Sequence, residues 1–216
     1  MSTPDMLDRY ARTALAGGTL VELITADRLP GRLASILSEL EPSCIQDYSS
    51  NGSQFLMPPP GSQRPARAPC RRIAALPASD WPQGMRESVE TILTASGYET
   101  VMPRKGPHGY TWDRDRLAGA LVGITWCSEF IADTGSLVLP AGPGTGTLAA
   151  LLPEVHLALS HVEGCRAGLA DCLRAMSCAL PSRLTFITGP SRTGDIEATM
   201  TPGVHGPRKV LHLILI

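Results

Sequence analysis

The sequence predicts an α/β fold with a three-layer α/β/α architecture, in which helices cover both faces of a mainly parallel sheet. Apolar segments with helical spacing alternate with short apolar runs that are typical of strands. Two of those runs, residues 184–188 and 210–216, are nearly unbroken and are bounded by turn residues, which predicts strands covered on both faces. Helices alternating with buried strands are typical of a parallel sheet.

The first forty residues carry clear local signals. Residues 6–15 have helical spacing and end at Gly17 and Gly18, which form a common helix stop. Leu33, Ile36 and Leu37 lie on one stripe of a second helix, which begins at a Pro-Gly turn and ends before Pro42. The elements predicted for this part are helices at residues 6–15 and 30–40 and strands at 19–25 and 43–48.

The remainder of the chain divides into an irregular and a regular part. Residues 49–84 are rich in Pro, Gly, Ser and Arg, with one apolar stretch at 73–76, and we expect either a flap over a site or an inert loop. The regular part predicts helices at residues 85–95, 113–119 and 162–180 and strands at 98–102, 121–125, 136–139 and 155–160, besides the two buried runs.

Composition limits the kinds of partner. The 216 residues are 43% hydrophobic, enough for one sizeable core, and we expect one domain over residues 1–216. Nineteen basic residues balance 20 acidic ones, which argues against a nucleic-acid or anionic-membrane partner. The start shows no secretory signal and no stretch is long enough to span a bilayer, so we expect a cytoplasmic protein.

The cysteines are not spaced like metal ligands. None of the six forms a Cys-x-x-Cys pair, and buried thiols acting as small hydrophobic groups are the simplest interpretation. Cys165 and Cys172 lie seven residues apart, which places them on one face if residues 162–180 form a helix. We therefore expect no metal or iron–sulfur cluster held by this chain alone.

The most informative segment follows the apolar run at residues 184–188. If that run is a parallel strand, the next residues lie at the carboxyl edge of the sheet, where such folds bind ligands. A hydroxyl there can cap a short helix whose N–H groups face an anion, and Arg192 can add a bidentate contact. The alternative is a capped turn whose Arg pairs with Asp195 and Glu197. The candidate ligand-binding residues are Gly189, Ser191, Arg192, Thr193 and Asp195.

A second glycine-rich segment precedes the last apolar run. Gly203 and Gly206 allow close backbone approach to a ligand, and His205 between them can donate, accept or shuttle a proton near neutral pH. The alternative is a tight turn with a structural histidine. We take Gly203 and Gly206 as ligand-binding candidates and His205 as a catalytic candidate.

A third candidate segment precedes the strand predicted at residues 136–139. It holds Asp133, Thr134, Gly135 and Ser136, with the acid Glu129 four residues before Asp133. Two nearby carboxylates can divide acid and base roles, which makes Glu129 and Asp133 catalytic candidates and the other three ligand-binding candidates. An ordinary Asp-Thr-Gly turn between strands, with solvated acids, is the alternative.

Three weaker patterns favour structural roles. His156 and His161 flank a predicted strand without an acid at ligand spacing. Residues 105–109, with Lys105 and His108, form either a basic lip over a pocket or a simple Gly-Pro loop. Residues 142–146 superficially resemble a phosphate loop but lack the Gly-Lys-Ser/Thr ending.

Four segments in order resemble the signatures of the lactate-utilisation (LUD domain) family and of its small C-type subunit. They occupy residues 132–136, 152–156, 188–197 and 203–207, so the resemblance covers roughly the C-terminal 90 residues. It implies a fold similar to that of glucosamine-phosphate deaminase, ribose-phosphate isomerase and the coenzyme A transferases. It also implies a role in oxidising L-lactate to pyruvate with two partner proteins, at least one of which carries iron–sulfur clusters.

Two functional hypotheses follow. In the first, the chain is a subunit or accessory protein of an iron–sulfur-dependent lactate-oxidising system, binds a small anion or a partner at the carboxyl edge of the sheet, and holds no cofactor itself. In the second, it is a stand-alone enzyme of the coenzyme A transferase or cyclo-ligase type that acts on a carboxylate or phosphate substrate, with Glu129 or Asp133 as acid, base or nucleophile. A binding module that regulates partners is a third hypothesis.

Overall fold

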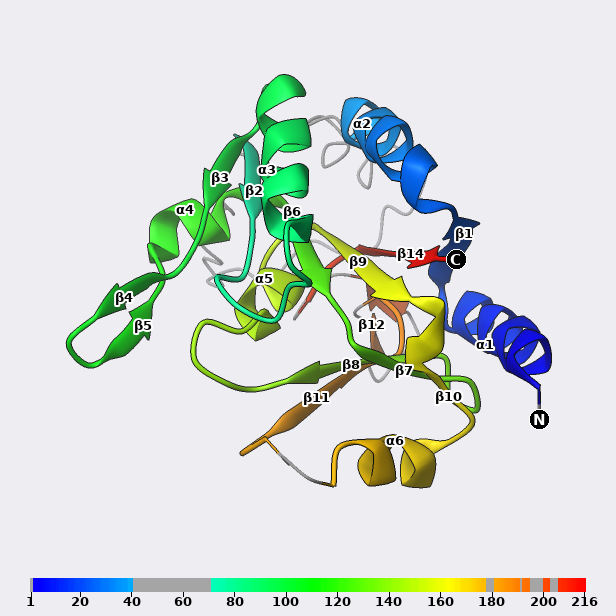
Figure 1. Ribbon diagram of the computed structural model, residues 1–216. Coiled ribbons are helices and arrows are strands. Elements are labelled where there is room, and N and C mark those ends of the chain that lie inside the picture. The colour runs from blue at the N-terminus through cyan, green and yellow to red at the C-terminus, as the bar shows by residue number, and fades with distance from the viewer. Residues whose placement is uncertain (1, 41–70, 178–180, 191, 195–199, 203–205) are drawn as a thin grey trace.

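The fold is built on a six-stranded sheet in which every neighbouring pair of strands is parallel. The computed structural model describes residues 2–40, 71–177, 181–190, 192–194, 200–202 and 206–216. The strand order is β1-β14-β9-β6-β2-β3 (Figure 1). The strands are β1 (Thr19–Ile24), β2 (Arg71–Ala75), β3 (Glu99–Val101), β6 (Ala120–Trp126), β9 (Val155–His161) and β14 (Lys209–Leu215).

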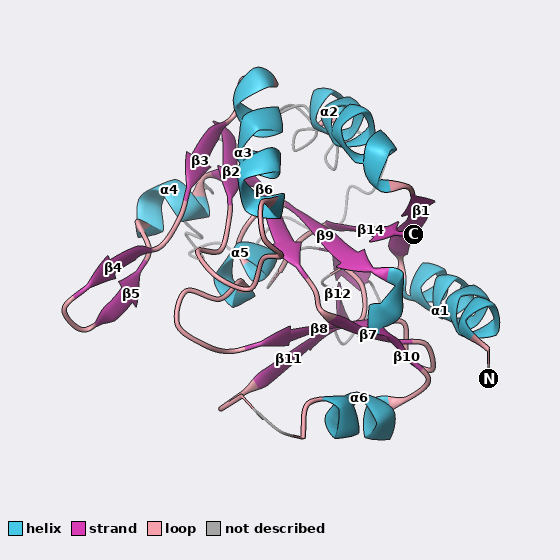
Figure 2. Cartoon of the chain, in the orientation of Figure 1, coloured by secondary structure: helices cyan, strands magenta, loops and turns pink. Residues whose placement is uncertain are grey.

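Helices lie on both faces of this sheet (Figure 2). On one face, α2 (Leu29–Glu39) and α3 (Met85–Ala95) bury apolar side chains against those of β6, β9 and β14. On the other face, α1 (Thr3–Gly17) and α5 (Thr147–Leu151) pack against the sheet. The predicted mainly parallel sheet between helices is therefore confirmed, and β14, which lies between β1 and β9, is almost fully buried, as the sequence predicts.

A second, smaller sheet lies on the α1 side of the main sheet (Figure 1). Its order is β10-β7-β8-β11, and both β7 and β11 pair antiparallel with β8. The helix α6 (Leu169–Ala175) packs on it through Cys172. The strands are β7 (Glu129–Ile131), β8 (Ser136–Pro140), β10 (Cys165–Arg166) and β11 (Leu184–Ile187).

A narrow hairpin projects from the edge of the molecule (Figure 1). Its strands β4 (Arg104–Gly106) and β5 (Gly109–Thr111) pair with each other, and α4 (Arg114–Ala118) follows. The side chain of Asp113 caps α4 by accepting a hydrogen bond from the backbone N–H of Arg116. A last pair of short strands, β12 (Arg192–Gly194) and β13 (Met200–Pro202), completes the described elements.

The ends of α1 follow the local signals of the sequence. Ser2 and Asp5 form a reciprocal capping box at its start. Gly18, in a left-handed conformation at φ 95°, closes its end by donating to the carbonyls of Ala14 and Leu15. The helix therefore ends at Gly17, and only Gly18 separates it from β1, as the Gly17-Gly18 pair predicts.

The predicted helix at residues 162–180 is wrong. This segment forms a 3₁₀ turn at Val162–Gly164, the strand β10 and then the shorter α6. Gly168 has extended backbone angles and separates strand from helix, and a Cβ on Gly164 would overlap the carbonyl of Ser128. Cys165 and Cys172 consequently lie on different elements rather than on one helix face. They and Cys127 are buried free thiols, as expected.

The strands β11 and β2 differ from expectation. β11 is not covered on both faces and is not part of the parallel sheet, because it pairs antiparallel with β8 at the edge of the small sheet, and Phe186 is 42% exposed. β2 is a strand that the sequence analysis assigned to the irregular segment; it lies between β3 and β6 in the main sheet. The strand expected at residues 43–48 and most of the irregular segment fall outside the described residues.

Within the described part of the chain, no helix combines the length and the apolar character that crossing a bilayer demands.

Candidate functional site

The Asp133 to Ser136 segment forms the tight turn between β7 and β8. The N–H of Gly135 closes it by donating to the carbonyl of Ile131. A chain of hydroxyls runs from this turn to the end of β11: Thr134 Oγ1 and Ser136 Oγ lie 2.7 Å apart, and Ser136 Oγ lies 2.7 Å from Thr188 Oγ1. The candidate segment at residues 133–136 thus lies beside the start of the one that follows residues 184–188. The antiparallel pairing of β8 with β11 brings them together.

The first helix lies directly over this turn. Gly135 has φ 66°, and a Cβ there would lie 2.5 Å from the backbone nitrogen of Ala14. Gly189, at φ 137°, packs in the same way against the carbonyl of Gly17. Both glycines therefore allow α1 to approach closely. In this structure Gly135 and Gly189 contact protein backbone and Ser136 is buried, so all three residues have a packing role, and the ligand binding expected of them stays a prediction.

The two candidate catalytic acids are each held by an arginine. Glu129 Oε1 accepts a hydrogen bond from Arg166 Nη2 at 3.0 Å, Oε2 lies 2.5 Å from Arg166 Nε in an ion pair, and only 13% of the Glu129 side chain is exposed. Asp133 lies 3.0 Å from the guanidinium of Arg9 on α1, and 44% of its side chain is exposed. These pairs tie β7 to β10 and the turn to α1.

The loop after β11 does not lie at the carboxyl edge of the parallel sheet, which corrects the sequence-based expectation. β11 pairs antiparallel with β8 in the second sheet, so its direction does not follow the parallel strands. Gly189 contacts Gly17, two residues before β1 begins, which puts this loop at the amino ends of the main strands. Residues 192–194 form β12, so the short helix expected from Ser191 or Thr193 does not begin there.

Several candidates cannot be placed. Ser191, Asp195, Gly203 and His205 lie outside the described residues, and for Arg192 and Thr193 only the backbone strand is described. Gly206 is buried and lies two residues before Arg208, just ahead of β14. The ligand-binding and catalytic roles assigned to these residues remain predictions.

A pocket of about 420 Å³ opens beside this loop, and we call it the amino-edge pocket. It lies between the start of β1, the start of β14 and the end of α2. Its wall is partly apolar, and its charged side chains are three cations and one acid, so its lining carries a net positive charge. The lining residues are Gly18, Leu20, Arg32, Ile36, Glu39, Leu40, Pro190, Arg208, Lys209, Val210 and Leu211.

The three cations of the amino-edge pocket differ in how they are held. Both oxygens of Glu22 accept from Arg32 Nε, at 2.9 and 2.8 Å, and Arg208 pairs with the buried Glu154 at 3.2 Å. Lys209 is exposed, and the described residues supply no carboxylate partner for its ammonium. The pocket therefore combines two braced guanidinium groups with one available ammonium, which suits a small anion.

The three cations of the amino-edge pocket were not among the site residues predicted from the sequence. Arg208 and Lys209 directly follow the glycine-rich segment at residues 203–207, which was a usable signal. Arg32 comes from α2, and nothing in its own helix indicates that it lies across from β14.

The glycine-rich segment 142–146 is held by several hydrogen bonds. Gly144 accepts hydrogen bonds through its carbonyl from the N–H groups of Ala78 and Ser79, and Ser79 Oγ donates to the carbonyl of Pro143. The N–H of Gly142 donates to Thr145 Oγ1. These bonds fasten the loop to the residues after β2. Across the described residues, no cluster of three or more His, Cys, Asp or Glu side chains is arranged to hold a metal ion.

Two buried histidines have structural surroundings. His156 Nε2 lies 2.8 Å from Thr125 Oγ1, and His212 bridges Tyr10 and Ser160. Burial lowers the pKa of each imidazole from 6.5 to about 3, so both are neutral at physiological pH. The structural role favoured for His156 therefore fits its position in the core.

Comparisons with known proteins agree with the motif resemblance. The chain is 31% identical over 126 residues to lactate utilization protein C of Bacillus subtilis, covering 52% of each chain. It is 33% identical over 116 residues to the protein of that name from Anoxybacillus flavithermus, covering 49% of this chain and 52% of the relative. The chain thus spans about half the length of the curated relatives it matches.

The fold also matches a solved structure. A DUF162 family protein from Deinococcus radiodurans superimposes with a TM-score of 0.61 at 18% identity, over 100% of this chain and 99% of that one. The LUD domain family model matches residues 94–216, which is more than half of the chain. The matched part runs from the end of α3 to the end of β14. The chain therefore belongs to the LUD domain family.

Proposed function

We propose that this chain acts in lactate utilisation as a component that binds a small carboxylate in the amino-edge pocket. The observation that carries the proposal is the set of three cations, Arg32, Arg208 and Lys209, over an apolar wall. Its context is the similarity to relatives named lactate utilization protein C.

The lining suits a short organic acid better than an inorganic anion. A guanidinium or ammonium can bind a carboxylate, whereas Leu20, Val210 and Leu211 offer apolar surface to a methyl group. L-lactate and pyruvate each have one carboxylate and one methyl group. Because Lys209 has no carboxylate partner among the described residues, a ligand can bind it without breaking an existing ion pair.

In this proposal, the redox chemistry belongs to partner proteins. The chain works beside iron–sulfur subunits, which take up the electrons released when lactate is oxidised, and it supplies binding rather than electron transfer. The motif resemblance to the small C-type subunit supports this division of labour. Copurification with a Cys-rich iron–sulfur protein encoded nearby would support it, and purification of that protein in an active form without this chain would contradict it.

The stand-alone enzyme hypothesis has less support. It requires Glu129 or Asp133 as an acid, base or nucleophile, and each of these carboxylates forms an ion pair with an arginine in the structure. Neither residue lines the amino-edge pocket.

A genetic experiment tests the proposal. Deleting the gene in its own organism, without a redundant lactate system, should impair growth on L-lactate, and the wild-type gene should restore growth. Lys209→Gln should restore it poorly. Lys105→Gln is the matched control, because Lys105 is the only other lysine and lies on the projecting hairpin. Normal growth of the deletion strain would overturn the proposed function.

A further inference from the structure

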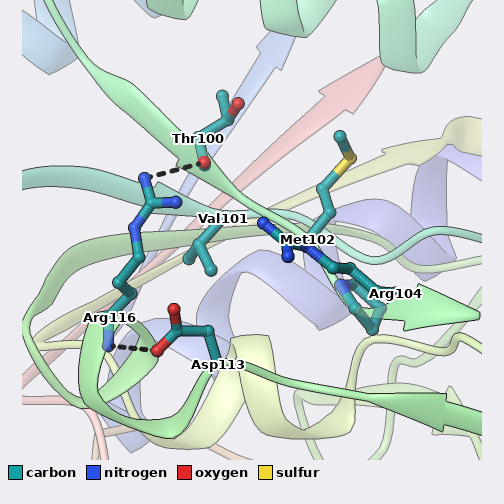
Figure 3. Close-up of a pocket in the computed structure, with 7 residues that line it drawn as sticks. Thr100, Val101, Met102, Arg104, Asp113 and Arg116 are labelled. Atoms are coloured by element: carbon teal, nitrogen blue, oxygen red, sulfur yellow. Dashed lines mark hydrogen bonds between the residues drawn. The ribbon is translucent and has the colours of Figure 1, made fainter.

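A second pocket lies at the opposite edge of the main sheet, where β3 ends. It has a volume of about 260 Å³ and we call it the β3 pocket (Figure 3). Its walls come from the end of β3, the start of the projecting hairpin and the start of α4. The lining residues are Thr100, Val101, Met102, Pro103, Arg104, Asp113 and Arg116.

The charged groups of the β3 pocket come from two elements. Arg104 begins the hairpin and Arg116 lies on α4, and their side chains extend toward Val101 from opposite sides (Figure 3). Arg116 is anchored, since its Nη2 donates to Glu99 at 3.0 Å and to the Thr100 carbonyl at 3.4 Å. Arg104 is exposed, and no described residue forms an ion pair with it. One guanidinium is therefore positioned and the other is available.

Asp113 adds an acceptor between the two arginines. Its Oδ1 accepts from the backbone N–H of Arg116 at 3.1 Å, which fixes the carboxylate at the start of α4. No hydrogen bond to Oδ2 is formed by the described residues. That oxygen can accept from a ligand that carries an O–H or N–H group.

The apolar residues complete the pocket. Val101 and Pro103 are buried and Met102 is partly buried, so they give the pocket an apolar wall below the charged groups. The position also agrees with a general rule, because the pocket lies beyond the carboxyl end of a strand in a parallel sheet. All of its residues fall within the segment that the family model matches.

From this arrangement we infer that the β3 pocket is a second binding site, which takes a short carboxylic acid bearing a hydrogen-bond donor on the adjacent carbon. The carboxylate binds Arg104 and Arg116, the donor binds Asp113 Oδ2, and the side chain of the acid packs on Val101 and Met102. A 2-hydroxy acid and a 2-amino acid share this chemistry. Residues 105–109, which continue the hairpin beyond Arg104, do not line the pocket.

Three acids of similar size test the inference. L-lactate carries a hydroxyl on carbon 2, L-alanine an ammonium, and propionate neither. Each is titrated into ¹⁵N-labelled full-length protein while the amides of residues 100–102, 104 and 113–116 are followed. At these amides, L-lactate or L-alanine should bind at least about tenfold more tightly than propionate, because only they can donate to Asp113. A preference for lactate identifies a hydroxy-acid site and a preference for alanine an amino-acid site.

Variants distinguish binding in the β3 pocket from a nonspecific effect of removing a positive charge. Arg104→Gln should weaken binding at least about tenfold, whereas Arg114→Gln, the same change at an exposed α4 residue outside the pocket, should change it less than about twofold. Asp113→Asn should keep the helix cap and abolish the preference over propionate. Equal binding of the three acids, no saturable shifts, or equal effects of Arg104→Gln and Arg114→Gln would overturn the inference.

The outcome is independent of the proposed function. Lys209→Gln should leave the shifts at the β3 pocket unchanged, and Arg104→Gln should leave those at residues 208–211 unchanged. If saturable shifts are absent at one pocket of the wild-type protein and present at the other, only the proposal for the first pocket has failed.

Discussion

The hydroxyl of Tyr10 lies 2.7 Å from Nδ1 of His212, and this buried contact joins the first helix to the last strand. Nε2 of the same ring lies 2.7 Å from Ser160 Oγ on β9. Both Tyr10 and His212 are fully buried, and Phe130 packs edge-on against both rings. The three polar side chains satisfy one another inside an otherwise apolar layer, so α1 is fixed to the sheet by a specific network as well as by apolar packing.

Tyr10→Phe tests this network. The substitution keeps the ring and removes the hydroxyl, which leaves His212 Nδ1 buried without its partner. We expect the free energy of unfolding to fall by about 1 to 3 kcal/mol in urea titrations. Tyr110→Phe, the same change at an exposed position on the hairpin, should cost less than about 0.5 kcal/mol. Equal effects of the two substitutions would contradict the structural role of the Tyr10 contact.

Stability should fall as the pH is lowered from about 6.5 toward 3. Burial lowers the pKa of His156 and His212 from 6.5 to about 3, and the proximity of His156 lowers that of His212 further. Between these values the unfolded chain binds protons that the folded chain does not, so each histidine contributes a slope of about 1.4 kcal/mol per pH unit.

One substitution isolates the contribution of a single histidine. His156→Gln removes one titrating group and can keep the hydrogen bond to Thr125, so the pH dependence of the free energy of unfolding should become shallower between pH 6 and 4 by about 1 kcal/mol per unit. An unchanged slope in His156→Gln would show that His156 does not titrate as its burial implies.

Gly135→Ala distinguishes packing from ligand binding. The new Cβ would overlap the backbone of α1 at a left-handed φ, so we expect the free energy of unfolding to fall by about 2 to 4 kcal/mol. Gly31→Ala is the matched control. Gly31 lies in α2 and a Cβ there would point into open space, so the substitution should raise the free energy of unfolding by about 0.5 kcal/mol. A stable Gly135→Ala protein that loses only ligand affinity would restore the binding role predicted from the sequence.

The Glu129 and Arg166 pair should be structural. Glu129→Gln leaves the part-buried Arg166 without a full counter-charge, and the expected loss of unfolding free energy is about 1 to 3 kcal/mol. A double-mutant cycle with Arg166→Met should show coupling of at least about 0.5 kcal/mol. If Glu129→Gln instead leaves stability unchanged and abolishes a measurable turnover, Glu129 is catalytic.

The sequence was a good guide to elements with local signals. The first helix has a capping box at one end and Gly18 at the other, and both lie in adjacent residues. The apolar run that became β14 was long enough to indicate a strand buried on both faces. Both features depend on neighbours in the chain, which is why they could be predicted without knowledge of the fold.

Elements defined by distant partners could not be predicted in this way. β11 has the composition of a buried parallel strand but pairs with β8 at an edge, and its register is set by residues 44 and more positions away. β2 lies in a segment of turn-forming residues and becomes a strand only between β3 and β6. The amino-edge pocket likewise depends on Arg32 and Lys209, which are 177 positions apart.

The most direct test of the account is whether the amino-edge pocket binds a small carboxylate. Pyruvate and L-lactate are titrated into ¹⁵N-labelled protein, and the amides of Gly18 and of residues 208–211 are followed in the wild type and in Lys209→Gln. We predict saturable shifts at these amides that Lys209→Gln weakens at least about tenfold. Shifts that do not saturate, or that Lys209→Gln leaves unchanged, would contradict the account.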